Sequence, residues 1–320
     1  MSKFNFIKNK KVSLIIVGIV LVVGIVSFIV RGFNIDIDFS GGTELHLDVG
    51  TEVTEDVCKN INKIIAEEKL LGKQYVSSTT QSSSGKNTAI IRTGTKALNI
   101  DQKIALYDDL IKAYPNAEEK FSVDNTISPS IGKSLTNKAI VAVVCAVVLM
   151  LIYIWIRFEL NSGLSAIICL IHDLFVMLTI YSLFQIPVNS NIIAALLTIL
   201  GYSINATIIV FDRIRENKKA NPDGDFGEIV NSSIHSTLAR SVNTTITTLL
   251  TIGMIYILGV DSIKNFALPL IIGIVAGLFS SVFLSGLIWT MLNKVFKPKS
   301  KEEKKKARLE KKAAKEKAKA

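Results

Sequence analysis

Long uninterrupted apolar segments constrain this chain more than any other feature of its sequence. The first runs from Val12 to Val30, and several segments of similar length follow beyond Thr136. About 18–20 apolar residues in a helix suffice to cross the ~30 Å hydrocarbon core of a bilayer. Such segments must be helical, because lipid offers no hydrogen-bond partners to exposed backbone groups. The sequence therefore predicts an α-helical polytopic membrane protein.

The start of the chain has features of both a signal peptide and a membrane anchor. Lysines precede the first apolar run, as they do in both kinds of segment. A signal peptide, however, has a shorter apolar core that ends in a small-residue cleavage site. This run ends in Phe28-Ile29-Val30-Arg31 instead. We therefore predict a cytoplasmic N-terminus at 1–11 and an uncleaved transmembrane helix at 12–31.

The segment 32–135 is more polar and carries the periods of strands and amphipathic helices. Polar and apolar residues alternate from Glu44 to Val49, which is typical of a half-buried strand. The expected elements are a strand within 35–49, a helix at 54–71, strands at 74–80 and 88–92, a helix at 100–114 and a strand at 118–127. The order β-α-β-β-α-β predicts an α+β ferredoxin-like domain between the first and second membrane helices.

The remaining apolar segments lie in the region 136–292. We expect helices at about 137–156, 163–185, 190–211, 238–259 and 265–292, which makes six transmembrane helices in all. Lysine and arginine are concentrated in the connections on one side, which usually faces the cytoplasm. Both termini are therefore expected in the cytoplasm, and the ferredoxin-like domain is expected to be extracytoplasmic.

The formal net charge of +10 is concentrated at one end of the chain. Between Lys294 and Lys319, thirteen basic residues and four glutamates give a balance of +9. This distribution argues against a nucleic-acid-binding domain, because the excess charge is confined to a terminal tail. The segment 293–320 is typical of a solvated cytoplasmic tail, or of one that contacts anionic membrane lipid.

Neither a catalytic constellation nor a metal-binding motif is visible in the sequence. Cys58, Cys145 and Cys169 lack the paired spacing of a disulfide framework or a zinc site. The soluble domain has no nucleotide-binding glycine loop and no triad-like set of residues. We therefore expect a protein that is not an enzyme and that needs no cofactor or metal.

Polar side chains inside the predicted membrane helices are the main functional candidates, because lipid makes them costly. His172 and Asp173 fall near the middle of the third helix, Asn205 in the inner half of the fourth, and Arg240 near the start of the fifth. Asp173 could relay protons or pair with a neighbouring helix, whereas His172 alone favours a structural role. Arg240 could take part in a polar pathway or extend to the membrane interface.

The fifth helix also carries a row of threonines, in which Thr244, Thr248 and Thr251 share one face beside Thr247. Such hydroxyls often bond the helix backbone four residues before, so the row fits packing as well as a pathway. Small residues that predict close helix packing recur in the sixth helix at Gly273, Gly277, Ser281 and Ser285.

Several segments resemble signatures of the SecF family, and the resemblance covers residues from about 10 to 296. Asp38-Phe39-Ser40-Gly41-Gly42-Thr43, just after the first helix, is similar to the Asp-Phe-x-Gly-Gly-Thr motif. Gly201-Tyr202-Ser203-Ile204-Asn205, followed by Phe211-Asp212-Arg213-Ile214-Arg215-Glu216-Asn217, is similar to the fourth-helix signature. His172-Asp173 and the segment from Leu238 to Thr244 fall in matching places.

The resemblance implies a function that the residues alone do not supply. SecF belongs to the resistance-nodulation-division superfamily and pairs with SecD in the bacterial cytoplasmic membrane. That pair associates with the SecYEG channel and helps to pull exported, unfolded polypeptide outward, with the proton-motive force as energy source after the ATP-driven step of SecA. YajC is a further candidate partner.

One departure from the family pattern bears directly on the proton path. The family usually has Asp directly after the Asn of Gly-Tyr-Ser-x-Asn, on the proton path with the fifth-helix Arg, but here the residue is Ala206. Either SecD or Asp173 supplies the carboxylate, or the chain is a scaffold that stabilises SecD and SecYEG without carrying protons. A half-size proton-driven exporter of small molecules would need larger external domains and an intact fourth-helix carboxylate.

Overall fold

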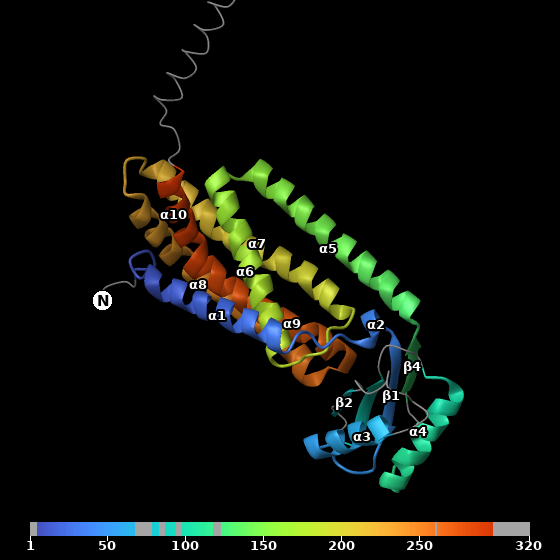
Figure 1. The fold of residues 1–320 in the computed structure, drawn as a ribbon. Coiled ribbons are helices and arrows are strands. Elements are labelled where there is room, and N and C mark those ends of the chain that lie inside the picture. Colours follow the sequence, from blue (N-terminus) through green and yellow to red (C-terminus); the bar gives the residue numbers. More distant parts are fainter. Residues whose placement is uncertain are drawn as a thin grey trace, which may run out of the picture.

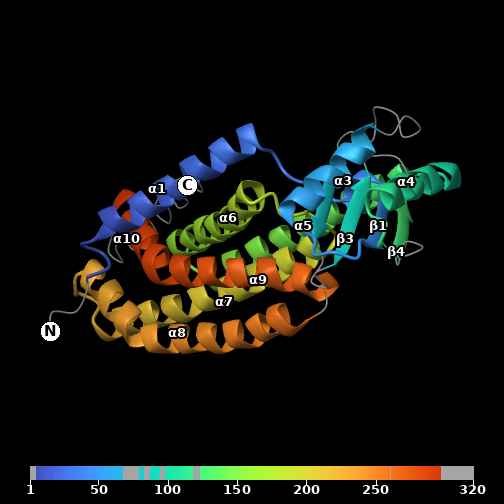
Figure 2. The same ribbon diagram turned by 90° about the horizontal axis from the view of Figure 1, so that it is seen from below.

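A bundle of long helices carries a smaller α+β domain at one of its ends (Figures 1 and 2). The structure is a computed structural model, and it describes residues 5–67, 79–82, 87–93, 98–117, 123–259 and 261–296. We call the end of the bundle beside the α+β domain the domain end. The opposite end, where the last helix leaves the bundle, is the tail end.

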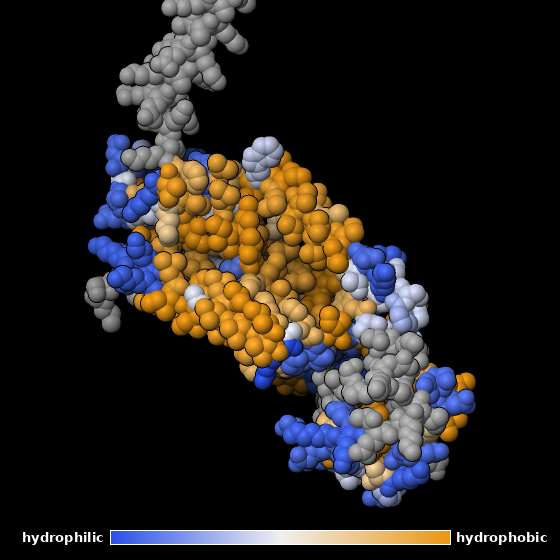
Figure 3. Space-filling view, in the orientation of Figure 1, coloured by the Kyte–Doolittle hydropathy of each residue, from blue (hydrophilic) through white to orange (hydrophobic). Residues whose placement is uncertain are grey.

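Six spans of the described chain are long and apolar enough to cross a membrane, as predicted. The last span is made of two α-helices with a π-helical segment between them. The spans are α1 (Lys10–Val30), α5 (Pro129–Arg157), α6 (Leu160–Leu183), α7 (Asn191–Ala220), α8 (Phe226–Leu258), and α9 (Asp261–Phe279) with η2 (Ser280–Ser285) and α10 (Gly286–Val295). Their outer surface forms a broad apolar band with polar residues at both ends (Figure 3).

Two helices extend well beyond the stretches that hydropathy predicts. Helix α7 continues to Ala220 and α8 begins at Phe226, so only 221–225 connect them. The basic segment from Arg213 to Lys219 is therefore helical, although the predicted fourth helix ended at residue 211. For the same reason Arg240 lies well inside α8 rather than near its start. Hydropathy marks where a helix can contact lipid, whereas the polar helix ends are fixed by caps such as Asp225, which accepts from Glu228 N.

The α+β domain has the predicted ferredoxin-like topology. Its antiparallel sheet has the order β2-β3-β1-β4, so that each helical crossover passes one intervening strand. The core contains Leu45, Leu47, Ile61, Ile91 and Leu106, all fully buried between the sheet and the two helices. The elements are β1 (Gly42–Asp48), α3 (Glu55–Glu67), β2 (Thr79–Ser82), β3 (Thr88–Thr93), α4 (Ile100–Ala113) and β4 (Val123–Ile127). The expected strand at 74–80 lies partly outside the described residues.

The segment before β1 differs from the prediction, because residues expected to be extended form the short helix α2 (Ile37–Ser40). The Asp36 side chain caps this helix by accepting a hydrogen bond from Ile37 N at 2.7 Å. Gly41 ends it with a φ of +77°, a conformation that favours glycine. The helix packs against the start of α5, where Gly132 faces the Phe39 carbonyl. The two-glycine motif thus lies where the backbone of α2 and that of α5 approach each other closely.

Gly41→Ala is expected to destabilise the protein by about 1–3 kcal/mol, because alanine rarely adopts this backbone conformation. Its Cβ would also lie only 2.8 Å from Pro129 Cα. Thermal unfolding of the purified protein would measure the loss. Gly18→Ala is the matched control, because no described atom lies within 4 Å of a Cβ at that position. Equal unfolding temperatures for the two variants would contradict the prediction.

The sixth span is not the continuous α-helix that the sequence predicts. Residues Ser280–Ser285 form a π-helical segment, η2, between α9 and α10. A π-turn contains more residues per turn than an α-helix and occurs often at functional sites. The turn is buried, and it faces α6 at the level where α6 carries its polar residues.

Candidate functional site

Asp173 lies at the centre of the bundle, where three membrane segments meet. The residue is 1% exposed. Its Oδ2 accepts hydrogen bonds from Ser203 Oγ of α7 at 2.5 Å and from Ser280 Oγ of η2 at 2.8 Å. Its Oδ1 lies 3.0 Å from Nδ1 of His172. A single carboxylate therefore joins α6, α7 and the sixth span, and pairing between helices is its structural role.

His172 and Asp173 form one buried polar pair halfway along the bundle. With a neutral imidazole and an ionised carboxylate, the pair would place one negative charge in an apolar interior, which is costly. The hydrogen bonds that Asp173 accepts from Ser203 and Ser280 offset part of this cost, so the pair depends on α7 and η2 for its stability.

Two further residues of α6 bond the π-turn from the same face as Asp173. Ser165 Oγ donates to the Ser285 carbonyl at 2.6 Å, and Cys169 Sγ lies 3.8 Å from the Ser280 carbonyl. Ser165, Cys169 and Asp173 are spaced by four residues, so they line one side of α6. This row and the π-turn form one polar contact surface within the bundle.

A second group of predicted residues lies on the outside of the bundle, along α7 and α8. Asn205, Arg240 and Thr244 are exposed, as is the neighbouring Asn243. Arg240 makes no hydrogen bond or ion pair with the part of the chain that the structure describes. Near the middle of the bundle, Tyr202 Oη donates to Thr248 Oγ1 at 3.3 Å. Polar side chains on an apolar membrane surface need a partner or water.

The threonine row of α8 bonds largely to its own helix. Thr248 Oγ1 donates to the Thr244 carbonyl at 2.9 Å, and Thr251 Oγ1 to that of Thr247 at 3.1 Å. This is the backbone bonding expected of a threonine row that serves packing. Thr248 in addition meets Tyr202, so it is the member of the row that connects α8 with α7.

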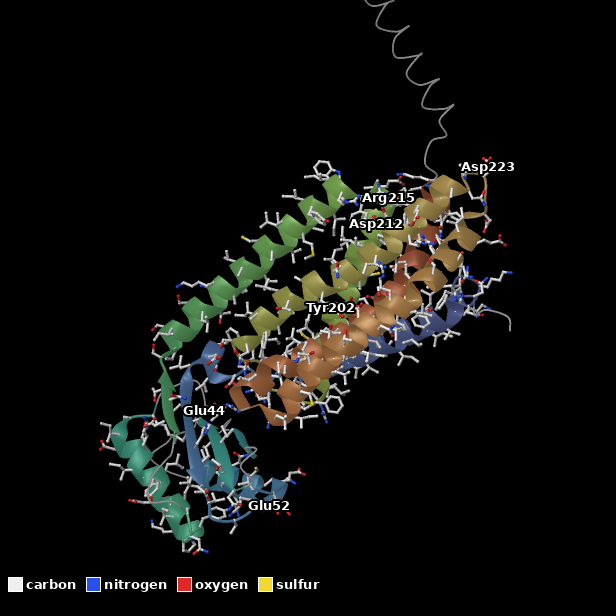
Figure 4. All side chains as sticks on the ribbon, turned by 180° about the vertical axis from the view of Figure 1, so that it is seen from behind. Glu44, Glu52, Tyr202, Asp212, Arg215 and Asp223 are labelled. Carbon is white, nitrogen blue, oxygen red and sulfur yellow. The ribbon has the colours of Figure 1, made fainter. Side chains whose placement is uncertain are left out.

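A cavity of about 360 Å³ opens between α7 and α8 towards the tail end. Arg240 forms its inner limit, and its polar lining continues to the end of α7 through Asp212, Arg213 and Glu216. Arg213 Nη1 donates to Glu216 Oε2 at 2.7 Å, and Asp212 lies 3.5 Å from Arg157 Nη2. Figure 4 shows Asp212 and Arg215 near the tail end, whereas Tyr202 lies midway along the bundle. The cavity therefore places Arg240 in one polar-lined space with Asp212, Arg213 and Glu216.

The predicted intramembrane network is therefore divided between two places. Asp173 and His172 are buried, whereas Asn205, Arg240 and Thr244 face outward on α7 and α8. Ala206 lies on α7 next to Asn205 and brings no carboxylate to the outer group. Gly201 is also exposed, with no described atom within 4 Å of a Cβ at that position.

The Asp-Phe-x-Gly-Gly motif lies at the domain end, away from both groups. Asp38 Oδ2 accepts a hydrogen bond from Ser190 N, at the start of α7, at 2.8 Å. The rest of the motif, Phe39, Gly41 and Gly42, lies beside the start of α5 and leads into β1. The motif is therefore the connection between the membrane bundle and the α+β domain.

Charged residues of the sheet meet this connection. Burial raises the pKa of Asp36, and the nearby Arg92 guanidinium offsets that increase only in part. Burial also acts to raise the pKa of Glu44, but hydrogen bonding to His46 and attraction to Arg92 outweigh it, so that pKa is lowered. The same cluster therefore shifts the pKa values of Asp36 and Glu44 in opposite directions.

Sequence reasoning missed Ser203, Ser280 and Ser165 as members of the buried site. A serine in an apolar helix is common and carries no charge, so it stands out less than an aspartate. The available signal was the four-residue spacing of Ser165, Cys169 and Asp173, which places one polar row on α6.

Comparison with known proteins gives consistent matches over most of the chain. Residues 107–295 match the family described as protein export membrane protein SecD/SecF, C-terminal. The chain is 37% identical to protein translocase subunit SecF of Acidaminococcus fermentans, over 93% of this chain and all of that protein. It is 32% identical to protein translocase subunit SecDF of Bacillus subtilis, over 90% of this chain but 38% of that longer protein.

A solved structure shares the fold. The crystal structure of SecDF from Thermus thermophilus, described as a translocon-associated membrane protein, matches with a TM-score of 0.77 and 30% identity. The match covers 89% of this chain and 38% of that one, so this chain corresponds to a little over a third of the SecDF polypeptide. Sequence motifs, membrane topology, domain fold and these relatives agree, and the chain belongs to the SecF family of protein translocase subunits.

Proposed function

We propose that this chain is a non-enzymatic subunit that works with SecD to couple the proton-motive force to protein export through SecYEG. The α+β domain would handle the emerging unfolded polypeptide, and the bundle would convert proton movement into movement of that domain. SecA would act indirectly, through the earlier ATP-driven step, and YajC is a further candidate partner. The site of action would be the bacterial cytoplasmic membrane, with both termini in the cytoplasm.

The observation that carries this proposal is the exposed polar face of α7 and α8. Arg240 is exposed on a membrane-spanning helix and has no partner in the described chain. Such a cation needs a carboxylate or water. Ala206 offers no carboxylate, so a counter-ion for Arg240 would come from a neighbouring protein, and SecD is the partner that the family relationship favours. The cavity below Arg240 would connect this meeting point with water at the tail end.

The alternative function is a scaffold that stabilises SecD and SecYEG without carrying protons. Ala206 favours it, because the outer polar group lacks a carboxylate of its own. The His172–Asp173 pair and the position of Arg240 beside a polar cavity favour the proton-coupled function. The two functions make different predictions for export in the presence and absence of a proton gradient.

Export into inverted membrane vesicles would separate them. With ATP and SecA supplied, vesicles that contain SecD and this chain are expected to export faster when a proton gradient is imposed. Vesicles that contain only SecD, at matched amounts of SecYEG, should not respond to the gradient. The comparison with matched SecD content is the control for a purely stabilising effect.

Equal stimulation by the gradient with and without this chain would contradict the proposal. A different result would indicate a scaffold. In that case the chain raises the amount of SecD in the membrane, but the export rate per SecD molecule is the same with and without the chain. Purification supplies a second readout, because the exposed polar face predicts co-purification with SecD.

A further inference from the structure

We propose that Asp36, Asp38 and Arg92 form a coupling joint that ties the α+β domain to the domain end of α7. Through this joint, movement of α7 would be passed directly to the domain. The proposal builds on the proposed function, because a moving α7 is what the joint would transmit. Its contacts, however, can be tested in the absence of export.

The first part of the joint is a backbone pairing between the linker after α1 and the connection between α6 and α7. Val188 N donates to the Asn34 carbonyl at 2.8 Å, and Asp36 N donates to the Val188 carbonyl at 3.1 Å. Asn34 Nδ2 adds a bond to the Gln185 carbonyl at 2.9 Å. The linker is thus fixed to the same connection from which α7 begins.

Asp38 provides the second part by capping α7 from outside. Ser190 is the cap position of α7, and its own side chain makes no capping bond. Its backbone N–H instead donates to Asp38 Oδ2. A carboxylate at a helix N-terminus is also favoured by the helix dipole. The helix held in this way is the one that carries Ser203, bonded to Asp173, and the exposed Asn205.

Arg92 provides the third part, because it reaches from the sheet to the linker. Its Nε lies 3.0 Å from Asp36 Oδ1 and donates to Glu44 Oε2 at 2.7 Å. The side chains of Arg92 and Asp36 are only 11% and 5% exposed. Glu44 in turn lies 3.1 Å from His46 Nε2. Figure 4 shows Glu44 at the side of the domain that faces the bundle, whereas Glu52 lies at the far side.

The charges of this cluster make Arg92 essential to the joint. Asp36 faces one cation, Arg92, and two other carboxylates act on it, those of Glu44 and Asp38. Removal of the guanidinium would leave the buried Asp36 carboxylate without its counter-ion and Glu44 with His46 alone, which is far more costly than never having had a charge at position 36. The domain would then separate from the linker, so that water could reach Asp36.

Neutralising Asp36 in addition should reverse this effect. Asn at position 36 still offers an oxygen to Ile37 N, so α2 keeps its cap, but it needs no cation. Arg92→Gln alone is therefore expected to release the domain, and Arg92→Gln combined with Asp36→Asn is expected to dock it again. A loss of packing around Arg92 would not be reversed by a second substitution.

The position of the domain can be measured with two spin labels. One replaces the exposed Asp108 of α4, and the other replaces Ile263, which is 47% exposed at the start of α9. Cys58, Cys145 and Cys169 are first replaced by Ser, and the full chain is reconstituted with SecD in lipid vesicles. We expect one narrow distance distribution for the parent, a broad one for Arg92→Gln, and a narrow one again for the double variant. Glu52→Gln, a carboxylate change at the far side of the domain, is the control and should stay narrow.

Asp38 supplies an independent variant that leaves the sheet unchanged. Asp38→Ala should lose the link to α7 and broaden the distribution, whereas Asp38→Asn should keep it, because an amide oxygen still accepts from Ser190 N. If Arg92→Gln and Asp38→Ala both retained the narrow parental distribution, the joint would be disproved. If the double variant stayed as broad as Arg92→Gln, the ion cluster would not hold the domain.

The response to a proton gradient is a separate readout. In the parent, the gradient is expected to shift the distance, and in Asp38→Ala the shift should be lost although SecD remains bound. If the gradient shifted the distance in neither the parent nor Asp38→Ala, the proposed proton coupling would be contradicted. The distributions without a gradient would still decide whether the joint exists.

Discussion

Replacing Arg240 with alanine is expected to abolish most of the gradient-dependent part of export while leaving the fold intact. The side chain is exposed and makes no hydrogen bond or ion pair within the described chain, so its removal should change stability by no more than about 0.5 kcal/mol. A hydrogen bond to a charged group contributes about 1.5–3 kcal/mol. Loss of such a bond between Arg240 and its proposed partner in SecD should slow the gradient-dependent step by roughly ten- to a hundredfold.

The measurement is export in inverted vesicles with ATP, with and without the gradient, at matched SecD content. Arg240→Lys keeps the positive charge and should retain part of the response. Lys219→Ala removes an exposed charge from the last turn of α7 and is the control, with export expected at the parental level. If Arg240→Ala exported like the parent while the gradient still mattered, protons would have to pass through SecD alone.

Asp173→Ala is expected to produce the largest loss of stability, about 2–5 kcal/mol. It removes the acceptor that Ser203 and Ser280 share, and it leaves a gap where α6, α7 and η2 meet. Thermal unfolding of the purified complex with SecD would show the loss. Ser203→Ala is a graded control, because it removes one of these hydrogen bonds and leaves the carboxylate in place.

Asp173→Asn separates the structural role of the carboxylate from the proton-carrying role proposed for it. The amide oxygen still accepts a hydrogen bond, so the fold should survive with a smaller loss of stability. The amide cannot bind and release a proton, so the gradient-dependent part of export should fall, though less than in Arg240→Ala. A folded Asp173→Asn variant with parental export would leave Asp173 with the pairing role only.

Hydropathy and the spacing of apolar residues predicted most of the architecture from the sequence alone. The apolar runs marked all six spans, because the bilayer sets a minimum length that few soluble helices reach. The ferredoxin-like order of the soluble domain followed from alternating strands and two amphipathic helices. Helix ends were harder, as the polar extensions of α7 and α8 show, because a helix can continue into water without any change of period.

The candidate site was predictable in its residues but not in its grouping. Asp173 and Arg240 could be identified because charged side chains are costly in lipid and therefore rare in membrane helices. Their separation into a buried and an exposed group depends on which face each helix turns inward, and a single sequence period does not fix that for helices that are apolar on all sides. The role of Asp38 was hidden for another reason, because its partner is a backbone N–H that lies 152 positions away in the chain.

The π-turn at Ser280–Ser285 has a consequence for how members of the family are aligned. A π-turn accommodates one residue more than the α-helical turn it replaces, so it corresponds to a one-residue insertion in a helix. A relative whose last helix is regular should therefore need a single-residue gap between the positions of Gly277 and Gly286. If the gap is placed elsewhere, Ser280 is matched with the wrong residue, and the partner of Asp173 would wrongly look variable across the family.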